Sequence, residues 1–387
     1  MNKFLTEFKE RGFFYQCTGE DDLSKLLDKE KINAYIGFDC TAESLHVGSL
    51  LQIMCLRLLQ KHGHRPIVLL GGGTTRIGDP SGKDKTRTIL SEDEIEKNIN
   101  NIEKILKIFL DDMDPKTKPI FVNNYTWLKN LNYISFLRDI GKHFTINKML
   151  SFDSVKTRLE REQSLSYMEF NYMILQAYDF LELNKTKNCM LQIGGSDQWG
   201  NIINGVDLIK RHSNNHVYGL TTPLITLASG AKMGKTESGA VWLDKKFLSP
   251  YDYWQFWRNI DDRDVLKFIK IFTDINIEQI NKIKNKNINE LKIILANKAT
   301  QMLHGEQEAK NSEETAKKTF SDNSIGENLP SISISKNVFK EKMTILDLIV
   351  LSKLENSKSE IRRLIKGNGV RINNQIIIDE KLIVTKN

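Results

Sequence analysis

The pattern of apolar and polar positions first predicts an α/β fold. Residues 34–39 (AYIGFD) predict a strand that runs into a loop, and residues 47–61 (VGSLLQIMCLRLLQK) carry apolar side chains at helical spacing. Pro66 precedes the short apolar run IVLL, which ends in Gly71-Gly72-Gly73. A strand, a helix and a second strand with glycines at its end form a βαβ unit. Such units build doubly wound parallel sheets, whose ligands lie beyond the carboxyl ends of the strands.

Further along, the pattern predicts a second α/β stretch and then a change of character. Helices are expected over 91–110, 131–140, 164–183 and 200–211, with a strand at MLQI (190–193). Beyond Pro250 the segments are helical and charged, without glycine-rich strand ends. Residues 321–335 predict a linker, which is followed by helices at 344–353 and 357–366 and by short strands at VRIN and IIID.

Composition indicates a soluble globular chain that stays where it is made. Hydrophobic residues make up 40% and charged residues 27%, and no apolar run approaches the roughly 20 residues of a membrane span. The first residues, MNKFLTEFKERGFF, resemble neither a secretory signal nor a transit peptide. None of the four cysteines forms a C-x-x-C pair, so we expect neither a zinc site nor a redox dithiol, and the cysteines fit a reducing cytosol.

The positive charge is concentrated near the C-terminus. The net charge is +7, and residues 330–387 hold 11 Lys/Arg against 6 Asp/Glu. Such a basic tail suits a polyanionic partner. A solvated lysine-rich surface explains the same charge equally well.

Two glycine-containing stretches follow the predicted strands. His46-Val47-Gly48-Ser49 stands where a loop becomes a helix, and a helix N-terminus attracts a phosphate that glycine allows to come close. GGGTTRIGDPSGK (71–83) does not have the spacing of a Walker loop, so it is either a ligand-facing loop or an ordinary surface loop. Taken alone, neither stretch distinguishes a nucleotide site from coincidence.

Three further groups carry possible chemistry. Tyr172, Gln176 and Asp179 share one face of an otherwise apolar helix, where they either pair internally or bind a polar ligand. Asp197 follows the glycines at the end of the second predicted strand, where a carboxylate can bind ribose hydroxyls, although a tight turn needs the same residues. Lys232 and Lys235 lie in a loop that suits a polyphosphate or simply faces water.

In this order and spacing, these stretches resemble the signatures of class I aminoacyl-tRNA synthetases. HVGS resembles the HIGH signature, and KMGKT (232–236) resembles KMSKS. YIGFDCTAESLHVGS, GGGTTRIGDPSGK, NYMILQAYDF, LQIGGSDQWGN and KMGKTESGAVWLD are similar to the tyrosine enzymes of bacterial type, and the similarity covers nearly the whole chain. It implies a Rossmann-type catalytic domain over 1–245 with an insertion at about 115–165, a helical domain over 246–325, and a small α+β RNA-binding domain over 330–387.

The resemblance also implies roles for individual residues. Those implied to bind tyrosine are Tyr35, Asp79, Tyr172, Gln176, Asp179 and Gln198. Those implied to bind ATP are Gly37, Asp39, His46, Gly48, Ser49, Asp197 and Lys235. The catalytic set is His46, Thr41, Lys232, Lys235 and Thr236, and tRNA would meet Arg362, Arg363 and Lys366.

The implied activity is ligation of L-tyrosine to tRNA(Tyr) with ATP. Mg²⁺ is expected to travel with ATP, with no metal held by the protein. The resemblance further implies a homodimer, and we expect its interface within 125–160, which holds Trp127, Phe136 and Phe144. Ser49, Cys40, Gly234 and Thr236 depart from the usual pattern. Two alternatives stay open: an adenylate-forming enzyme for another amino acid, and a catalytically inactive RNA-binding relative.

Overall fold

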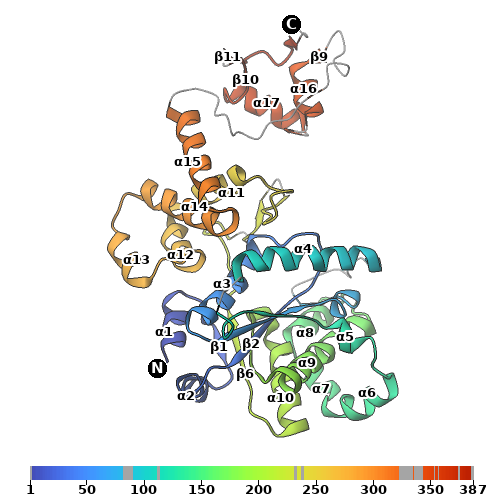
Figure 1. Cartoon of the computed structure of the whole chain (residues 1–387). Coiled ribbons are helices and arrows are strands. Elements are labelled where there is room, and N and C mark those ends of the chain that lie inside the picture. Colours follow the sequence, from blue (N-terminus) through green and yellow to red (C-terminus); the bar gives the residue numbers. More distant parts are fainter. Residues whose placement is uncertain are drawn as a thin grey trace.

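The computed structural model describes residues 2–81, 90–110, 114–230, 233–236, 239–321, 334 and 343–384 without 353, 356 and 374 (Figure 1). In these ranges a six-stranded sheet runs in the order β1–β6–β5–β2–β3–β4. Its strands are β1 (Gln16–Cys17), β2 (Asn33–Phe38), β3 (Arg65–Leu70), β4 (Ile120–Asn123), β5 (Cys189–Gly195) and β6 (Tyr218–Thr222). All neighbours pair in parallel except β1, which is antiparallel to β6.

The strand order contains a topological switch point between β2 and β5. From β2 the chain proceeds outward through β3 to β4, and it then returns to β5 on the other side of β2 and continues to β6. Long helices connect the strands: α3 (Val47–Lys61), α4 (Glu92–Leu110), α9 (Tyr167–Lys187) and α10 (Trp199–Ser213). The predicted doubly wound α/β fold is thus confirmed, and the ends of β2 and β5 mark the place where such a sheet binds its ligand.

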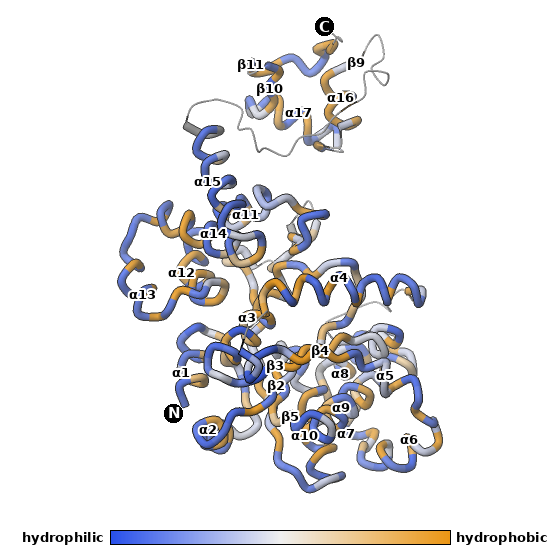
Figure 2. The backbone as a smooth tube through the Cα atoms, in the orientation of Figure 1, coloured by the Kyte–Doolittle hydropathy of each residue, from blue (hydrophilic) through white to orange (hydrophobic). Residues whose placement is uncertain are grey.

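Both faces of the sheet are covered, which explains why β3 is a continuous apolar run. Val68 and Leu70 belong to the core on the side of α3 and α4, whereas Ile67 and Leu69 face the core beneath α9. This alternation is the period of two that a strand imposes on its side chains. In Figure 2 the hydrophobic residues accordingly gather along the central strands.

The connection between β4 and β5 is a run of short helices followed by the long helix α9. The short helices are α5 (Tyr125–Leu128), α6 (Tyr133–Asp139), α7 (Ile146–Leu150) and α8 (Asp153–Glu160). A capping box starts α9, because the Ser166 side chain accepts from the Glu169 N–H and the Glu169 side chain bonds back to the Ser166 backbone. Helix α9 ends at Asn188, which adopts the left-handed conformation.

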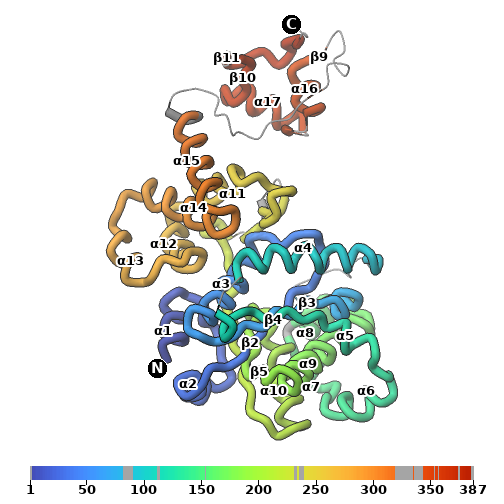
Figure 3. The backbone as a smooth tube through the Cα atoms, viewed as in Figure 1, coloured from blue at the N-terminus to red at the C-terminus, as the bar shows by residue number. Residues whose placement is uncertain are grey.

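A helical unit follows the sheet and shares its core. It consists of α11 (Pro250–Arg258), α12 (Asp262–Phe272), α13 (Ile277–Ile283), α14 (Ile288–His304) and α15 (Glu306–Ser321). Its centre is aromatic, with Trp257 packed against Phe268 and Phe272. One set of buried side chains runs from the sheet and α3 into these helices. Figure 3 shows the chain path through the two units.

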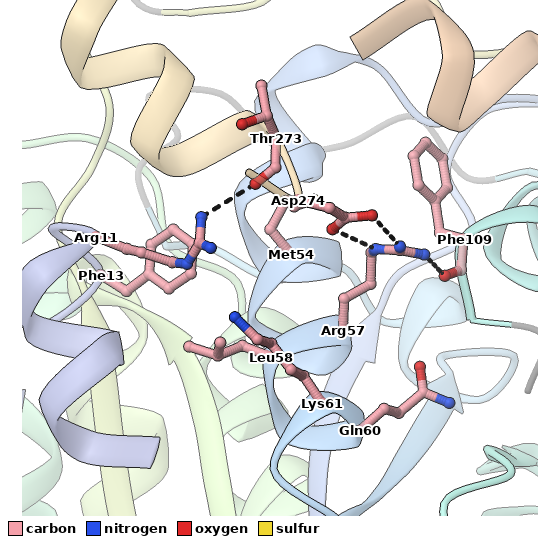
Figure 4. A pocket seen from close by; sticks show the side chains of 10 residues that line it. All are labelled: Arg11, Phe13, Met54, Arg57, Leu58, Gln60, Lys61, Phe109, Thr273 and Asp274. Carbon is pink, nitrogen blue, oxygen red and sulfur yellow. Dashed lines mark hydrogen bonds and ion pairs between the residues drawn. The ribbon is translucent and has the colours of Figure 1, made fainter. Parts of the chain in front are cut away.

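Two arginines connect the helical unit to the sheet unit through hydrogen bonds and an ion pair (Figure 4). Arg11, at the end of α1 (Lys3–Glu10), donates to the carbonyl oxygens of Lys270 and Thr273 at 2.7 and 3.0 Å. Arg57, on α3, pairs with Asp274 and also donates to the backbone carbonyl of Phe109. The far end of α3 is therefore tied to the turn that follows α12.

The last described segment forms a small unit with its own core. Strand β9 (Met343–Thr344) pairs with β12 (Ile383–Val384), and β10 (Arg371–Ile372) pairs with β11 (Gln375–Ile376). Helices α16 (Ile345–Leu351) and α17 (Lys358–Lys366) pack between them. Both predicted helices are present, whereas the strands are shorter than VRIN and IIID suggest. The predicted linker 321–335 lies almost wholly outside the described residues.

Some elements were not foreseen from the pattern. Helices α1 and α2 (Glu20–Lys29) and strands β1, β4 and β6 have no strong sequence signal of their own.

None of the described helices is both long and apolar enough to cross a membrane.

Candidate active site

The carboxyl ends of β2 and β5 open into a cleft of about 350 Å³. Its walls come from β2, the first turns of α3, the short helices η1 (Thr74–Arg76) and η3 (Ser196–Gln198), and α9. The cleft-lining residues that were also predicted from the sequence are Tyr35, Gly37, Asp39, Gly48, Ser49, Asp79, Tyr172, Gln176, Asp179, Asp197 and Gln198. They meet because β2 and β5, although far apart in sequence, are neighbours at the switch point.

Two buried polar side chains, Tyr35 and Asp179, face the inner part of the cleft, each only 1% exposed. The Asp179 carboxylate accepts from Asn124 Nδ2 at 2.9 Å and from Trp127 Nε1 at 2.8 Å. Burial raises the pKa of Asp179 to about 7, although these two donors act to lower it. The Tyr35 hydroxyl has no hydrogen-bond partner in the described part of the chain. Burial and the nearby Asp179 raise the pKa of Tyr35 well above its ordinary value, so its phenol remains a donor.

A chain of hydrogen bonds joins Asp179 to a second carboxylate, Asp39. Tyr172 donates its hydroxyl to Asp39 Oδ2 at 3.0 Å, and Thr74 donates to Asp39 Oδ1 at 2.9 Å. Asn124 Nδ2, which contacts Asp179, also donates to Thr74 Oγ1 at 3.0 Å. The positions of both carboxylates are therefore fixed by shared neighbours.

A second network surrounds Asp79. Its carboxylate accepts from Gln198 Nε2 at 2.8 Å and from the backbone N–H of Ser81 at 2.9 Å. Asn201 Nδ2 donates to both Gln198 Oε1 and Gln176 Oε1, at 3.1 and 3.0 Å. A half-buried carboxylate beside amide oxygens is a suitable environment for a small cation such as an ammonium group.

His46 forms the N-terminal cap of α3. Its Nδ1 accepts from the Gly48 N–H at 2.9 Å, so the neutral ring carries its proton on Nε2. Gly48 is required for close packing, since a Cβ there would lie 2.5 Å from Cε1 of His46. Gly234 has φ +89°, and a Cβ there would lie 2.8 Å from the Gly48 nitrogen. The departure from KMSKS at Gly234 thus has a physical reason, because the two signature stretches touch through glycines.

The remaining predicted residues of the signature loop are only partly described. Lys232 lies outside the described residues, and for Lys235 and Thr236 only the backbone is described, as strand β7 (Lys235–Thr236) paired with β8 (Gly239–Ala240). Thr41 is exposed in the loop between β2 and α3, outside the set that lines the cleft. Asp197 is exposed at η3 at the cleft edge.

The predicted tRNA-binding residues lie far along the chain on α17. Arg362, Arg363 and Lys366 are all exposed. Arg362 pairs with Glu380 at 3.4 Å, and Arg363 pairs with Glu360 at 3.1 Å. Surface pairs of this kind are weak and can exchange for phosphate contacts.

Sequence reasoning missed several polar residues at the site. Thr74, Asn124 and Asn201 connect the carboxylates and amides, and Trp127 contacts Asp179 rather than being only an apolar interface residue. Gln192 lines the cleft with its Oε1 buried and without a partner among the described atoms. The available signal was a glutamine inside the apolar strand MLQI. The described residues include no group of three or more His, Cys, Asp or Glu placed to hold a metal.

Comparison with known proteins agrees with this geometry. The family model described as tRNA synthetases class I (W and Y) matches residues 27–321. The tyrosine–tRNA ligase of Pelagibacter ubique (strain HTCC1062) is 84% identical over 386 residues, covering 100% of this chain and 94% of that protein. The tyrosine–tRNA ligase of Rickettsia rickettsii (strain Sheila Smith) is 51% identical over 388 residues, with the same coverage.

A solved structure gives the same result. The C-terminally truncated mitochondrial tyrosyl-tRNA synthetase of Aspergillus nidulans superposes with a TM-score of 0.74 at 30% identity, covering 82% of this chain and 94% of that chain. With a family match over most of its length and close relatives over all of it, the chain belongs to the bacterial-type tyrosyl-tRNA synthetases, the class I enzymes that ligate tyrosine to tRNA.

Proposed function

We propose that the cleft between β2 and β5 activates L-tyrosine with ATP and then transfers the tyrosyl group to tRNA(Tyr). The observation that carries this assignment is the buried pair Tyr35 and Asp179 at the inner part of a cleft whose rim is the N-terminus of α3. One part of the cleft offers partners for a phenol, and the other offers the positive end of the α3 helix dipole for a phosphate.

The inner end selects the substrate side chain. The phenol hydroxyl of tyrosine donates to Asp179 and accepts from Tyr35, whose hydroxyl otherwise has no partner in the described structure. Phenylalanine would leave the buried Tyr35 hydroxyl without a partner and would deprive Asp179 of its substrate donor, and an unpaired buried polar group costs about 1–3 kcal/mol. Trp127 and Asn124 keep the Asp179 carboxylate in place.

The substrate ammonium group binds next to Tyr172, Gln176 and Asp79, with Gln198 completing the contact. Asp79 supplies the negative charge, and its bond from Gln198 at 2.8 Å orients it. This arrangement directs the tyrosine carboxylate toward the rim of the cleft.

ATP binds along the rim, with Gly37, Asp39, Gly48, Ser49 and Asp197 around its adenosine and phosphates. Thr41 and the Nε2–H of His46 donate to phosphate oxygens, while Lys232, Lys235 and Thr236 close over the departing pyrophosphate. Mg²⁺ arrives as part of the ATP substrate.

Activation requires no protein nucleophile. The tyrosine carboxylate oxygen attacks the α-phosphorus, the bond from that phosphorus to pyrophosphate breaks, and tyrosyl-adenylate forms. A terminal ribose hydroxyl of tRNA then attacks the tyrosyl carbonyl, and AMP leaves. Positioning and stabilisation of the developing negative charge account for the catalysis.

The remaining units serve tRNA. We place the catalytic domain at 1–245, a helical anticodon-side domain at 246–325 and an RNA-binding domain at 330–387. Arg362, Arg363 and Lys366 contact tRNA phosphates, because they are exposed and lie together near one end of α17.

We further propose a homodimer formed through the segment 125–160, working in the cytoplasm. Trp127, Phe136 and Phe144 are half-buried and pack against the core. The exposed apolar residues of the segment extend the proposed contact surface: Tyr133, Ile134, Leu137, Ile146, Leu150 and Leu159. Gel filtration is expected to give twice the chain mass, and a monomer mass would contradict this interface.

ATP–pyrophosphate exchange, scanned with each amino acid separately, tests the assignment. We expect exchange with tyrosine alone, and a loss of discrimination against phenylalanine in Tyr35→Phe and Asp179→Ala. Exchange with a different amino acid would keep the chemistry but overturn the roles of these two residues. Absence of exchange with every amino acid would leave only RNA binding.

A further inference from the structure

The loop that joins β2 to α3 is held by two side chains from outside the substrate-binding set. Cys40 lies in this loop between Asp39 and Thr41 and is fully buried. Its N–H donates to Thr75 Oγ1 at 2.8 Å, and its carbonyl accepts from Asn98 Nδ2 at 2.9 Å. Both partners are distant in sequence, since Thr75 comes from η1 and Asn98 from α4.

Each of these bonds fixes one peptide plane. The N–H of Cys40 belongs to the peptide group that begins at Asp39, and its carbonyl belongs to the peptide group that ends at Thr41. A peptide group is rigid, so holding one of its atoms in a directed hydrogen bond sets the orientation of the whole plane. Thr75 therefore orients the backbone of Asp39, and Asn98 orients that of Thr41.

Burial makes this arrangement restrictive. Thr75 is 9% exposed and Asn98 is 4% exposed, so water cannot readily replace either side chain. A buried backbone group that loses its partner is destabilised, and the loop cannot turn either plane without that loss.

The turn that carries Thr75 is itself bonded to the end of β2. Gly71 donates its N–H to Phe38 O at 2.9 Å, and Thr75 donates its N–H to Gly71 O at 2.8 Å. A Cβ at Gly71 would lie 2.3 Å from Asp39 Oδ1, so only glycine allows this approach. Two adjacent threonines therefore contact this loop. Thr74 donates to the Asp39 carboxylate, and Thr75 accepts from the N–H of Cys40.

We propose that Thr75 and Asn98 are positioning residues for the activation step, which they support by orienting Asp39 and Thr41. The inference rests on the proposed function, in which those two residues contact the reacting substrates. Neither Thr75 nor Asn98 needs to touch tyrosine or ATP for this role.

The test removes each hydrogen bond while keeping side-chain volume, with Thr75→Val and Asn98→Leu. The measurement is the single-turnover rate of tyrosyl-adenylate formation per titrated active site, together with tyrosine affinity. We expect the rate to fall roughly 10- to 100-fold, the range that small misplacements of reacting groups cost. Tyrosine affinity should stay at the parental level, and Thr75→Ser, which keeps the hydroxyl, should restore the rate.

Matched controls separate positioning from stability. Thr300→Val changes a buried threonine on α14, and Asn100→Leu changes an exposed asparagine on α4, and both should keep the parental rate. Melting temperatures are measured for all variants. Thr75→Val and Asn98→Leu proteins that melt earlier but keep the parental rate per active site would overturn the proposal, because their role would then be structural only.

Thr41→Ala distinguishes failure of this inference from failure of the proposed function. If Asn98 acts through Thr41, adding Asn98→Leu to Thr41→Ala should cause little further loss, whereas multiplied losses would refute that route. A parental rate in Thr41→Ala would refute the proposed role of Thr41 and the Asn98 route with it. A slow Thr41→Ala beside fast Thr75→Val and Asn98→Leu would refute the positioning inference alone.

Discussion

Tyrosine binding should strengthen as pH rises through 7, because Asp179 must be ionised to accept the substrate phenol. Burial raises the pKa of Asp179 to about 7 in the ligand-free enzyme. The ionised fraction then increases from about 10% at pH 6 to about 90% at pH 8. If only the ionised form binds well, the dissociation constant for tyrosine falls about tenfold over this range.

The same raised pKa has the opposite effect on stability. The folded ligand-free protein holds the Asp179 proton more tightly than the unfolded chain, whose carboxyl has a pKa near 3.8. The protonated Asp179 therefore makes its full contribution to the free energy of unfolding below pH 4. This contribution, on the order of 4 kcal/mol, is lost as pH rises through about 7. Asp179→Asn, which carries no charge, should unfold at a higher temperature than the parent at pH 8.

Isothermal titration calorimetry with tyrosine at pH 6, 7 and 8 checks the binding prediction, with Asp179→Asn as the matched variant. The parent should show the steep pH dependence, and the variant should bind weakly with little pH dependence. The Tyr35 phenol does not contribute to the slope, since burial keeps its pKa well above this range. A flat parental profile, or an equal slope in the variant, would refute the reasoning.

Three further outcomes follow from the contacts. Gly234→Ala should slow activation at least about tenfold, because its Cβ would clash with the first turn of α3. Gly230→Ala is the control: Gly230 also has a positive φ, +83°, but open space around it, so the change adds only backbone strain of about 1–2 kcal/mol. The exchange rates of the two variants are compared. Arg57→Met should lower the free energy of unfolding by only about 1 kcal/mol, because the ion pair with Asp274 that it removes is half-exposed. The exchange rate should stay at the parental level. A urea titration measures the stability, and an unaltered free energy of unfolding would contradict the prediction. Deletion of 330–387 should impair tRNA charging but spare exchange, and unchanged charging would exclude this segment as a tRNA contact.

The sheet was predictable because its strands carry strong local signals. IVLL and MLQI are short apolar runs that end in glycines, and both proved to be central strands whose two faces are covered. By contrast, β4 (IFVN) and β6 (YGLTT) are ordinary short segments, and their pairing depends on neighbours that lie far away in sequence. Helix α1 likewise owes its position to packing against α3.

The site residues were recognised from motifs, but their connections were not. Tyr172, Gln176 and Asp179 could be assigned to one helix face from spacing alone. Nothing in the sequence indicated that Asn124 would contact both Thr74 and Asp179, because those contacts span about 50 residues and require the sheet to be assembled. The departure at Gly234 looked like a weakened signature until the structure placed it against Gly48.

A crystal structure with a non-hydrolysable tyrosyl-adenylate analogue tests the central claim most directly. The account predicts that the phenol oxygen lies within hydrogen-bond distance of both Asp179 and the Tyr35 hydroxyl. It also predicts the ammonium group beside Asp79 and the phosphate near the N-terminus of α3. An analogue bound elsewhere, or one whose phenol points away from Asp179, would contradict the assignment of this cleft.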